Sequence, residues 1–327
     1  MKIKERSADL LPSSQKKESA QRIHTFKRNF KRDWQLWALA IIPLAQLLIF
    51  HYGPMYGVQI AFREYSLSGG IVGSEWVGLK WFADFLTDPK FGRIFLNTII
   101  LNLYYLITFP LSVIMALLLN SMMNKKYRKT VQTISYLPHF ISTTVFVGII
   151  NMILSPTVGI YGNVYRLLGG EGLPVDFKAT AEAFRHIYVW SGVWQSLGWG
   201  TILYTSALSA VPVELHEAAS IDGASRFKRI WYVDLPSIMP TIAITFIMRV
   251  GGLVGVGFEK AYLLQSNINK STAEVVSTYV YRKGMNSFRN YSYGSAVDLF
   301  NTAINIALVF VANAISRKLS EGEVSLF

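Results

Sequence analysis

Six long apolar segments constrain this chain more than any other feature of its sequence. Each is close to the roughly 20 helical residues that cross a hydrocarbon core about 30 Å thick. Since a helix satisfies its backbone hydrogen bonds internally, the segments predict an all-α, polytopic integral membrane protein with six transmembrane helices. The predicted spans are 36–53, 95–122 with a kink at Pro110, 136–154, 187–211, 236–258 and 293–315.

The composition favours a membrane protein over a soluble one. Charged residues make up 16% and hydrophobic residues 51% of the 327 positions, whereas a soluble domain carries about 25% charged residues. The chain has no cysteine, which excludes a disulfide framework and a thiolate metal site. The net charge of +12 is also typical of nucleic-acid binding, but the positions of the basic residues give a simpler explanation.

Lysine and arginine are concentrated in the connections on one side of the predicted membrane. Nineteen of the 32 lie in 1–33, 125–129, 212–236 and 317–327, and one, Arg249, lies inside a span. The connection KKYRK is short, and short loops are the ones that the positive-inside rule governs. We therefore expect both termini and the 212–236 loop to be cytoplasmic, with the lipid bilayer and no nucleic acid as a partner.

The predicted organisation follows from these assignments. The leader is too long and too acidic for the start of a signal peptide, so we expect the first span to remain uncleaved. The expected parts are a cytoplasmic N-terminal segment at 1–33, a transmembrane domain at 34–316 with a coupling loop at 212–236, and a cytoplasmic tail at 317–327.

Motifs for enzymatic chemistry are absent from the sequence. It has no Gly-x4-Gly-Lys-Ser/Thr phosphate loop and no Gly-x-Ser-x-Gly elbow, and its five histidines do not cluster at metal-ligand spacing. No acidic pair lies inside an apolar span, as a proton-driven carrier would need. We therefore expect no catalytic residue, no metal site and no cofactor on this chain, and an outside source of energy.

A polar segment separates the fourth and fifth predicted spans. Pro212 suits the first turn of a helix and Gly223 the position just past its end. Ala218 and Ala219 leave a nearly bare surface that another protein can approach closely, and Glu217 is a charged group beside it. The pattern fits either a docking helix or an ordinary amphipathic connection.

The run EAASIDGASRFKRIWYVDLP resembles the EAA loop of the membrane subunits of bacterial ABC importers. Its one departure is Val233, where the family more often has isoleucine. The resemblance implies that this loop docks in a cleft of an ATP-hydrolysing subunit, which binds ATP and Mg²⁺, and that the first glutamate pairs with a basic residue there. The matching residues are Glu217, Ala218, Ala219, Gly223, Leu235 and Pro236.

Further stretches resemble the carbohydrate-uptake permeases of this class, especially the branch for polysaccharide-derived oligosaccharides, near which the alginate importers lie. They are YGPMYGVQIAFREY (52–65), SYLPHFIS (135–142), VGFEKAYLLQ (256–265) and YSYGSAVDLF (291–300).

The resemblance implies a subunit that forms half of the translocation pathway for an oligosaccharide in a bacterial cytoplasmic (inner) membrane. One version of this expectation is an acidic, alginate-like oligosaccharide. Its implied partners are a second homologous permease, two ATPase subunits and an extracytoplasmic sugar-binding protein. A permease for peptides or amino acids, and a secondary transporter that needs no ATPase, remain as alternatives.

Arg249 is the one charged residue inside the fifth predicted span. It lies about 20 Å along the helix from Pro236, toward the outer half of the membrane. A lone arginine in a span usually faces a cavity or a partner. It would bind a sugar carboxylate, pair with Asp298, or snorkel to the outer interface. Asp298 departs from related sequences, which commonly have a small residue there.

Other candidates for the substrate pathway are aromatic or polar. Trp194, Trp199 and Tyr204 would stack on sugar rings or pack within the protein, and Asn301 would bond to hydroxyl groups or to a neighbouring helix. Glu259, just outside the fifth predicted span, is a candidate contact for the binding protein or a partner loop.

Overall fold

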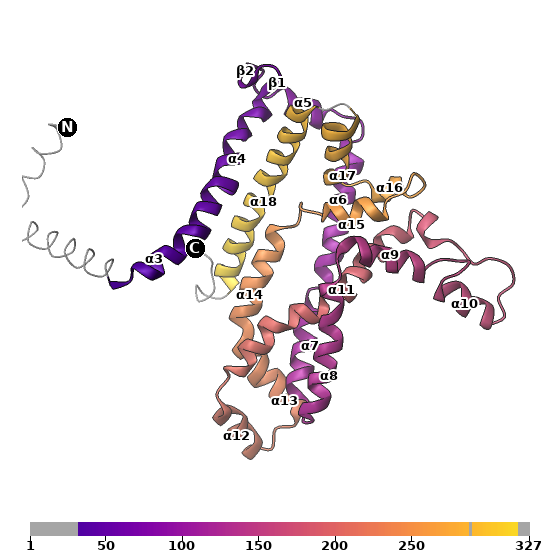
Figure 1. Ribbon diagram of the computed structural model, residues 1–327. Helices are drawn as coiled ribbons and strands as arrows, with labels where there is room; N and C mark the ends of the chain where they lie inside the picture. The colour runs from indigo at the N-terminus through magenta and orange to yellow at the C-terminus, as the bar shows by residue number, and fades with distance from the viewer. Residues whose placement is uncertain (1–31, 288–289, 320–327) are drawn as a thin grey trace, which may run out of the picture. The chain divides into compact units, whose positions relative to one another are not determined.

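The computed structural model describes residues 32–287 and 290–319 (Figure 1). It divides into two compact units, Met1–Gln59 and Ile60–Phe327. Most of the predicted leader and most of the predicted tail lie outside the described residues.

The first apolar segment forms one helical run. α3 (Trp34–Leu47) continues through a π turn (Leu48–Tyr52) into α4 (Gly53–Met55). The run from Trp34 to Phe62 has 29 residues and is long and apolar enough to cross a membrane. It contains the first predicted span.

The second unit begins with a β-hairpin, which the all-α prediction did not include. β1 (Arg63–Ser66) and β2 (Gly70–Trp76) pair antiparallel. Gly70 has φ +61°, which a glycine adopts without strain at a tight turn. α5 (Lys80–Leu86) follows and is held against the hairpin, because the Trp81 indole donates to the Arg63 carbonyl at 2.9 Å.

Three more helical runs of the described chain are long and apolar enough to cross a membrane. The first joins α6 (Phe91–Ile107) to α7 (Pro110–Ser121), with Pro110 at the start of α7, where its missing N–H costs no helical bond. The second is Arg226–Gly251, and the third lies in α18 (Tyr291–Leu319). They match the second, fifth and sixth predicted spans in position.

α11 (Ala183–Ser209) occupies the fourth predicted span. Its 27 residues make a helix about 40 Å long. Glycine, serine and threonine residues make it less apolar than the other spans, and some of them are needed for packing. A Cβ on Gly198 would lie 2.2 Å from the Ser135 carbonyl oxygen, so only glycine fits where α11 crosses α8 (Lys125–Tyr136).

The third predicted span, 136–154, contains a sharp bend that the sequence did not indicate. After α8 and a 3-10 turn (Leu137–Phe140), the chain bends by 105° into α9 (Thr143–Ile153). The bend occurs because Ile141 is extended, and because the Ser142 side chain accepts from Val145 N at the start of α9. Four helical runs of the described chain, or five if this bent pair is one span, can cross a membrane, so the count of six stays a prediction.

The remaining elements lie in the connections. α10 (Ile160–Leu167) follows α9, and α12 (Val213–Ile221) and α13 (Arg226–Arg229) follow α11. α15 (Phe258–Leu264), α16 (Lys270–Ala273), α17 (Val276–Val280) and a π segment (Tyr281–Ser287) precede α18.

The fifth predicted span ends earlier than expected. α14 (Leu235–Gly251) stops before an irregular stretch, in which Val254 N donates to the Asn305 side chain of α18 at 3.0 Å. The two helices pack closely, since a Cβ on Gly251 would lie 2.3 Å from Val309.

Candidate functional site

The segment predicted to couple the chain to an ATPase forms a short exposed helix and a sharp turn. α12 (Val213–Ile221) has no buried residue. Glu217 and Ala218 are exposed and Ala219 is partly exposed, so this face is open to another protein. Gly223 follows with φ +74°, a left-handed conformation that suits glycine at the end of a helix.

One helical run joins this segment to the apolar region. α13 (Arg226–Arg229) continues through a π turn (Ile230–Asp234) into α14 (Leu235–Gly251). The helix that contains the fifth predicted span begins at Arg226, ahead of Pro236, and runs for 26 residues, about 40 Å. Pro236 lies in the first turn of α14, where the wide π turn accommodates a residue without an N–H.

Asp234, which sequence analysis missed, ties α12 to this run. Its side chain is buried, with its Oδ1 3.4 Å from His216 Nε2 of α12 and 3.4 Å from Asn120 Nδ2 of α7. Arg229 donates to the Ser220 hydroxyl of α12 at 2.9 Å. These contacts link α12 to α14 and to α7. The sequence feature that could have indicated a role for Asp234 is its position as the single acid in the apolar run IWYVDLP.

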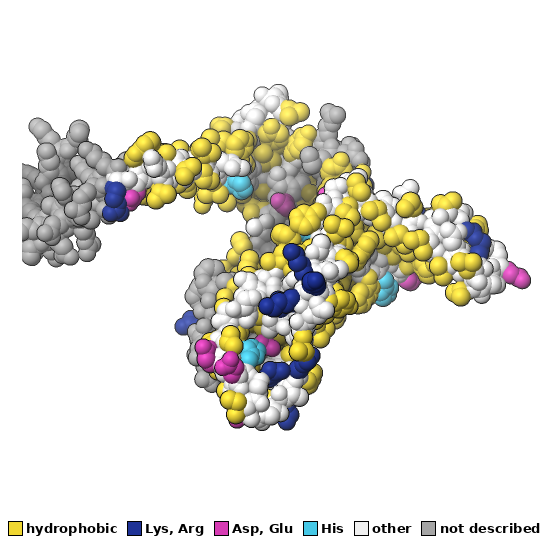
Figure 2. Space-filling model, turned by 60° about the horizontal axis from the view of Figure 1, so that its bottom comes forward, with side chains coloured by type: hydrophobic (Ala, Val, Ile, Leu, Met, Phe, Trp, Pro, Cys, Tyr) yellow, Lys and Arg dark blue, Asp and Glu magenta, His cyan; other side chains and the backbone are white. Residues whose placement is uncertain are grey.

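Within the second unit, α12 and α13 lie at the end opposite the hairpin and α5 (Figure 1). Figure 2 brings the α12–α13 end forward and shows acidic and basic side chains gathered over it. Exposed apolar side chains accompany these charges, including Ile221, Phe227 and Tyr232. An exposed surface that mixes charges with large apolar groups is suited to protein docking.

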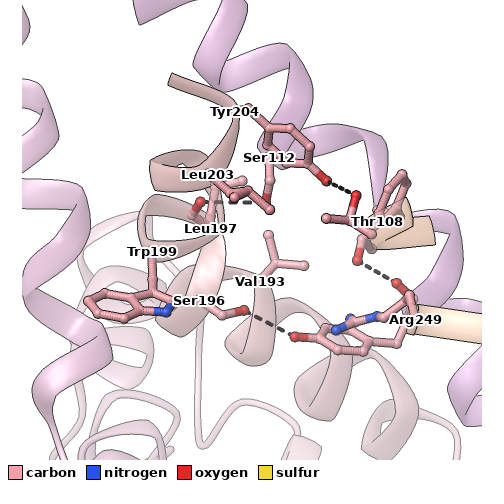
Figure 3. Close-up of a pocket in the computed structure, with 13 residues that line it drawn as sticks. Thr108, Ser112, Val193, Ser196, Leu197, Trp199, Leu203, Tyr204 and Arg249 are labelled. Atoms are coloured by element: carbon pink, nitrogen blue, oxygen red, sulfur yellow. Dashed lines mark hydrogen bonds between the residues drawn. The ribbon is translucent and has the colours of Figure 1, made fainter. Parts of the chain in front are cut away.

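A cavity of about 370 Å³ lies among α6, α7, α11 and α14 (Figure 3). The Arg249 guanidinium carbon is 3.9 Å from the centroid of the Tyr105 ring, a cation–π contact. The Tyr204 hydroxyl lies 2.8 Å from Thr245 Oγ1. The walls thus offer hydroxyl groups, aromatic rings and one cation, which are suited to binding sugar hydroxyls, ring faces and carboxylates.

Of the three alternatives for Arg249, pairing with Asp298 is excluded. Arg249 forms no ion pair within the described chain, and Asp298 is exposed in a different cavity, beside Tyr65 and Tyr291. The N–H donors of the guanidinium are therefore not used in an ion pair and face the cavity.

The predicted aromatic candidates divide between the cavity and the packing around it. Tyr204 and Trp199 line the cavity, and Trp199 also stacks on the His139 ring with centroids 4.4 Å apart. Trp194 does not line it, because its ring lies against Phe146 of α9 with centroids 5.1 Å apart.

The two remaining candidates also lie apart from Arg249. Glu259 is exposed on α15 and accepts a hydrogen bond from the Thr144 hydroxyl at 3.0 Å. Asn301 lies on α18, partly buried, and its Oδ1 has no hydrogen-bond partner among the described residues.

A second cavity of about 380 Å³ adjoins the first and shares Tyr105 and Ser196 with it. Lys260 of α15 lies in its wall and is buried. Sequence analysis did not single out Lys260. The signal for a buried position was the apolar run AYLL that follows it directly.

Comparisons with known proteins agree with this arrangement. The family model described as "Binding-protein-dependent transport system inner membrane component" matches residues 108–321. Protein LplB of Bacillus subtilis is 41% identical over 292 residues, which cover 89% of this chain and 91% of that protein. The polygalacturonan/rhamnogalacturonan transport system permease protein YteP of the same organism is 38% identical over 285 residues, covering 86% and 88%.

A solved structure is similar in both sequence and fold. It is a bacterial alginate ABC transporter in complex with a periplasmic protein that holds an alginate pentasaccharide. One of its chains is 36% identical to this one and superimposes with a TM-score of 0.80, covering 91% of this chain and 99% of that one.

Proposed function

This chain belongs to the family of binding-protein-dependent transport system inner membrane components, and we propose that it forms half of an oligosaccharide pathway that a separate ATPase drives through the 212–236 loop. It is a permease subunit of a sugar ABC importer and an integral protein of the inner membrane.

One observation carries the coupling proposal: the unbroken helix from Arg226 to Gly251. Its first turns contact α12, and Arg249 near its other end lines the cavity. When an ATPase subunit moves the exposed face of α12, the helix and the Asp234 contacts shift the cavity wall with it. Glu217 supplies a charge for a basic residue of the ATPase.

The proposed orientation places α12, the basic helix α8 and both termini in the cytoplasm. The four lysines and arginines of KKYRK lie in α8, and short basic connections stay on the cytoplasmic side. In this orientation the hairpin and α5 face outward, toward an extracytoplasmic sugar-binding protein.

The proposed assembly contains a second permease, two ATPase subunits and the binding protein. Closure of the ATPases draws the paired α12 segments together and opens the cavity outward. The binding protein releases its sugar into the cavity, and hydrolysis returns the pathway to its inward-facing form.

The proposed cargo is an acidic oligosaccharide. YteP is named for polygalacturonan and rhamnogalacturonan, and the similar transporter structure holds alginate; uronate units carry carboxylates. Arg249 presents an unpaired guanidinium to the cavity, and guanidinium groups pair with carboxylates in a fixed fork geometry. Neutral sugars would not require that charge.

Uptake by the reconstituted importer tests this proposal. Liposomes containing both permeases and the ATPase, supplied with the binding protein, are offered hexuronate oligosaccharides, neutral oligosaccharides, peptides and amino acids. We expect ATP-dependent uptake of the hexuronates. Uptake of peptides or amino acids instead, or uptake that proceeds without ATP, would contradict the proposal.

A further inference from the structure

Lys260 is a buried cation with no acidic partner. Its side chain belongs to α15, beyond the end of the fifth span, and the residue is only 9% exposed. It forms no ion pair with any described residue. Its Nζ makes one hydrogen bond, to the Tyr188 carbonyl oxygen at 2.8 Å, which leaves two of its three donors unused.

The surroundings make room for this ammonium and hold it at the wall of the second cavity. The Nζ lies 4.8 Å from the centroid of the Tyr188 ring and 5.7 Å from that of Phe146, within the range of cation–π attraction. A Cβ on Gly192 would lie 3.1 Å from Nζ and 3.3 Å from the Tyr105 ring. Glycine at this position therefore keeps space open beside the charge.

The other groups that face Nζ do not neutralise it. Tyr105, Tyr188 and His139 line the same cavity. Glu259, the nearest acid along α15, is exposed and bonded to Thr144. Burial lowers the pKa of Lys260 to about 7, because removal from water disfavours the charged form. An anion that enters the cavity restores that charged form.

A hydrogen-bonded pair separates Lys260 from Arg249. The Tyr105 hydroxyl and Ser196 Oγ are 3.0 Å apart, and both residues line both cavities. Arg249 stacks on the Tyr105 ring from the first cavity, while Lys260 lies in the wall of the second. Each cavity therefore presents one cation, on either side of a shared partition.

We propose that the Lys260 cavity is a second carboxylate subsite, which binds one uronate unit of the cargo while Arg249 binds another. This inference rests on the proposed function and adds a site to it. The Gln195 amide and the Ser142 and Thr143 side chains line the same cavity and supply hydrogen bonds for the sugar hydroxyls.

A purely structural role does not account for Lys260. A hydrogen bond from α15 to the Tyr188 carbonyl needs only a neutral donor, whereas a buried unpaired ammonium carries a large desolvation cost. A neutral amide donor, such as the side chain of glutamine, carries a much smaller desolvation cost. An anion that binds in the polar cavity beside the ammonium would offset the desolvation cost of that charge, which gives the lysine a role in ligand binding.

The test is direct binding to the assembled importer in nanodiscs, without the binding protein. The ligands are a short hexuronate oligosaccharide and its carboxyl-reduced, neutral counterpart, and calorimetry measures the ratio of their affinities. We expect Lys260→Gln to lower this ratio about tenfold, the loss of one charge-assisted hydrogen bond. Lys260→Arg, which keeps the charge, and Lys90→Gln, at an exposed lysine outside both cavities, should keep the wild-type ratio.

The pH dependence gives a second readout. As pH rises from about 6 to about 8, Lys260 loses its proton, so hexuronate affinity should fall in the wild type. It should fall much less in Lys260→Arg, since arginine stays charged.

The outcomes separate this inference from the proposed function. A wild-type importer that prefers the hexuronate, with the same preference in Lys260→Gln, would overturn the subsite alone. A wild-type importer with no preference for the hexuronate would overturn both the acidic cargo and the subsite.

Discussion

Replacing Glu217 with lysine is expected to reduce ATP-driven uptake at least 30-fold while leaving the chain folded and inserted. Glu217 is exposed on α12 and makes no hydrogen bond or ion pair among the described residues, so its reversal disturbs little within the chain. At a docking interface the same change turns an attraction into a repulsion, and one such contact costs about 2 kcal/mol or more, which is roughly 30-fold.

The measurements for Glu217→Lys are uptake in liposomes and the amount of ATPase subunit that co-purifies. Both should fall together. Glu171→Lys is the matched control, because it makes the same charge change at an exposed position between α10 and α11, away from α12, and it should retain wild-type uptake. Intact uptake in Glu217→Lys would sink the docking proposal.

Arg249→Ala is expected to lower uptake of an acidic oligosaccharide roughly 10- to 100-fold, and to lower basal ATPase activity less. The substitution removes the one cation from the first cavity and the cation–π contact with Tyr105. A charge-assisted hydrogen bond contributes about 1.5–3 kcal/mol, which corresponds to this range.

The carboxyl-reduced cargo is the control for Arg249. Its uptake should fall less than that of the hexuronate, since it has no carboxylate to lose. Hexuronate uptake by Arg249→Lys should lie between that of the wild type and that of Arg249→Ala, because lysine keeps the charge but lacks the planar guanidinium fork. Unchanged hexuronate uptake in Arg249→Ala would show that this arginine does not contact the cargo.

Much of the fold could be predicted because length and apolarity alone define a membrane span. The first and sixth predicted spans lie within helical runs long and apolar enough to cross a membrane, and the second coincides with such a run except for its last residue. The local rule for glycine also held, since Gly223 follows α12 in a left-handed conformation. Pro110, predicted as a kink, is the first residue of a new helix, α7.

Apolarity could not show where a helix breaks. In the third segment, 136–154, the turn around Ile141 and the Ser142 cap break an apolar run that reads as continuous. In the fifth segment, 236–258, the helix begins ahead of Pro236 and stops at Gly251. The ends of the apolar run therefore do not coincide with the ends of the helix. The hairpin was not predicted because its two strands are short and lie in a connection between long apolar spans.

The residues that line the cavity were harder to predict than helix α12. An apolar span has no polar face to orient it, so Trp194 and Trp199, little more than one turn apart, looked equally able to face a sugar. Packing decides between them: Trp199 lines the cavity and Trp194 lies on Phe146. Lys260 was overlooked because a lysine near a span end usually extends to water.

The central claim is that α12 is where an ATPase subunit docks, and a cross-link tests it most directly. The chain has no cysteine, so Ala218→Cys provides a single attachment point for a photoreactive maleimide on the exposed face of α12. We expect a covalent product with the ATPase subunit. Asn267→Cys, exposed between α15 and α16, should give none. Absence of that product from position 218, or its appearance from position 267, would contradict the claim.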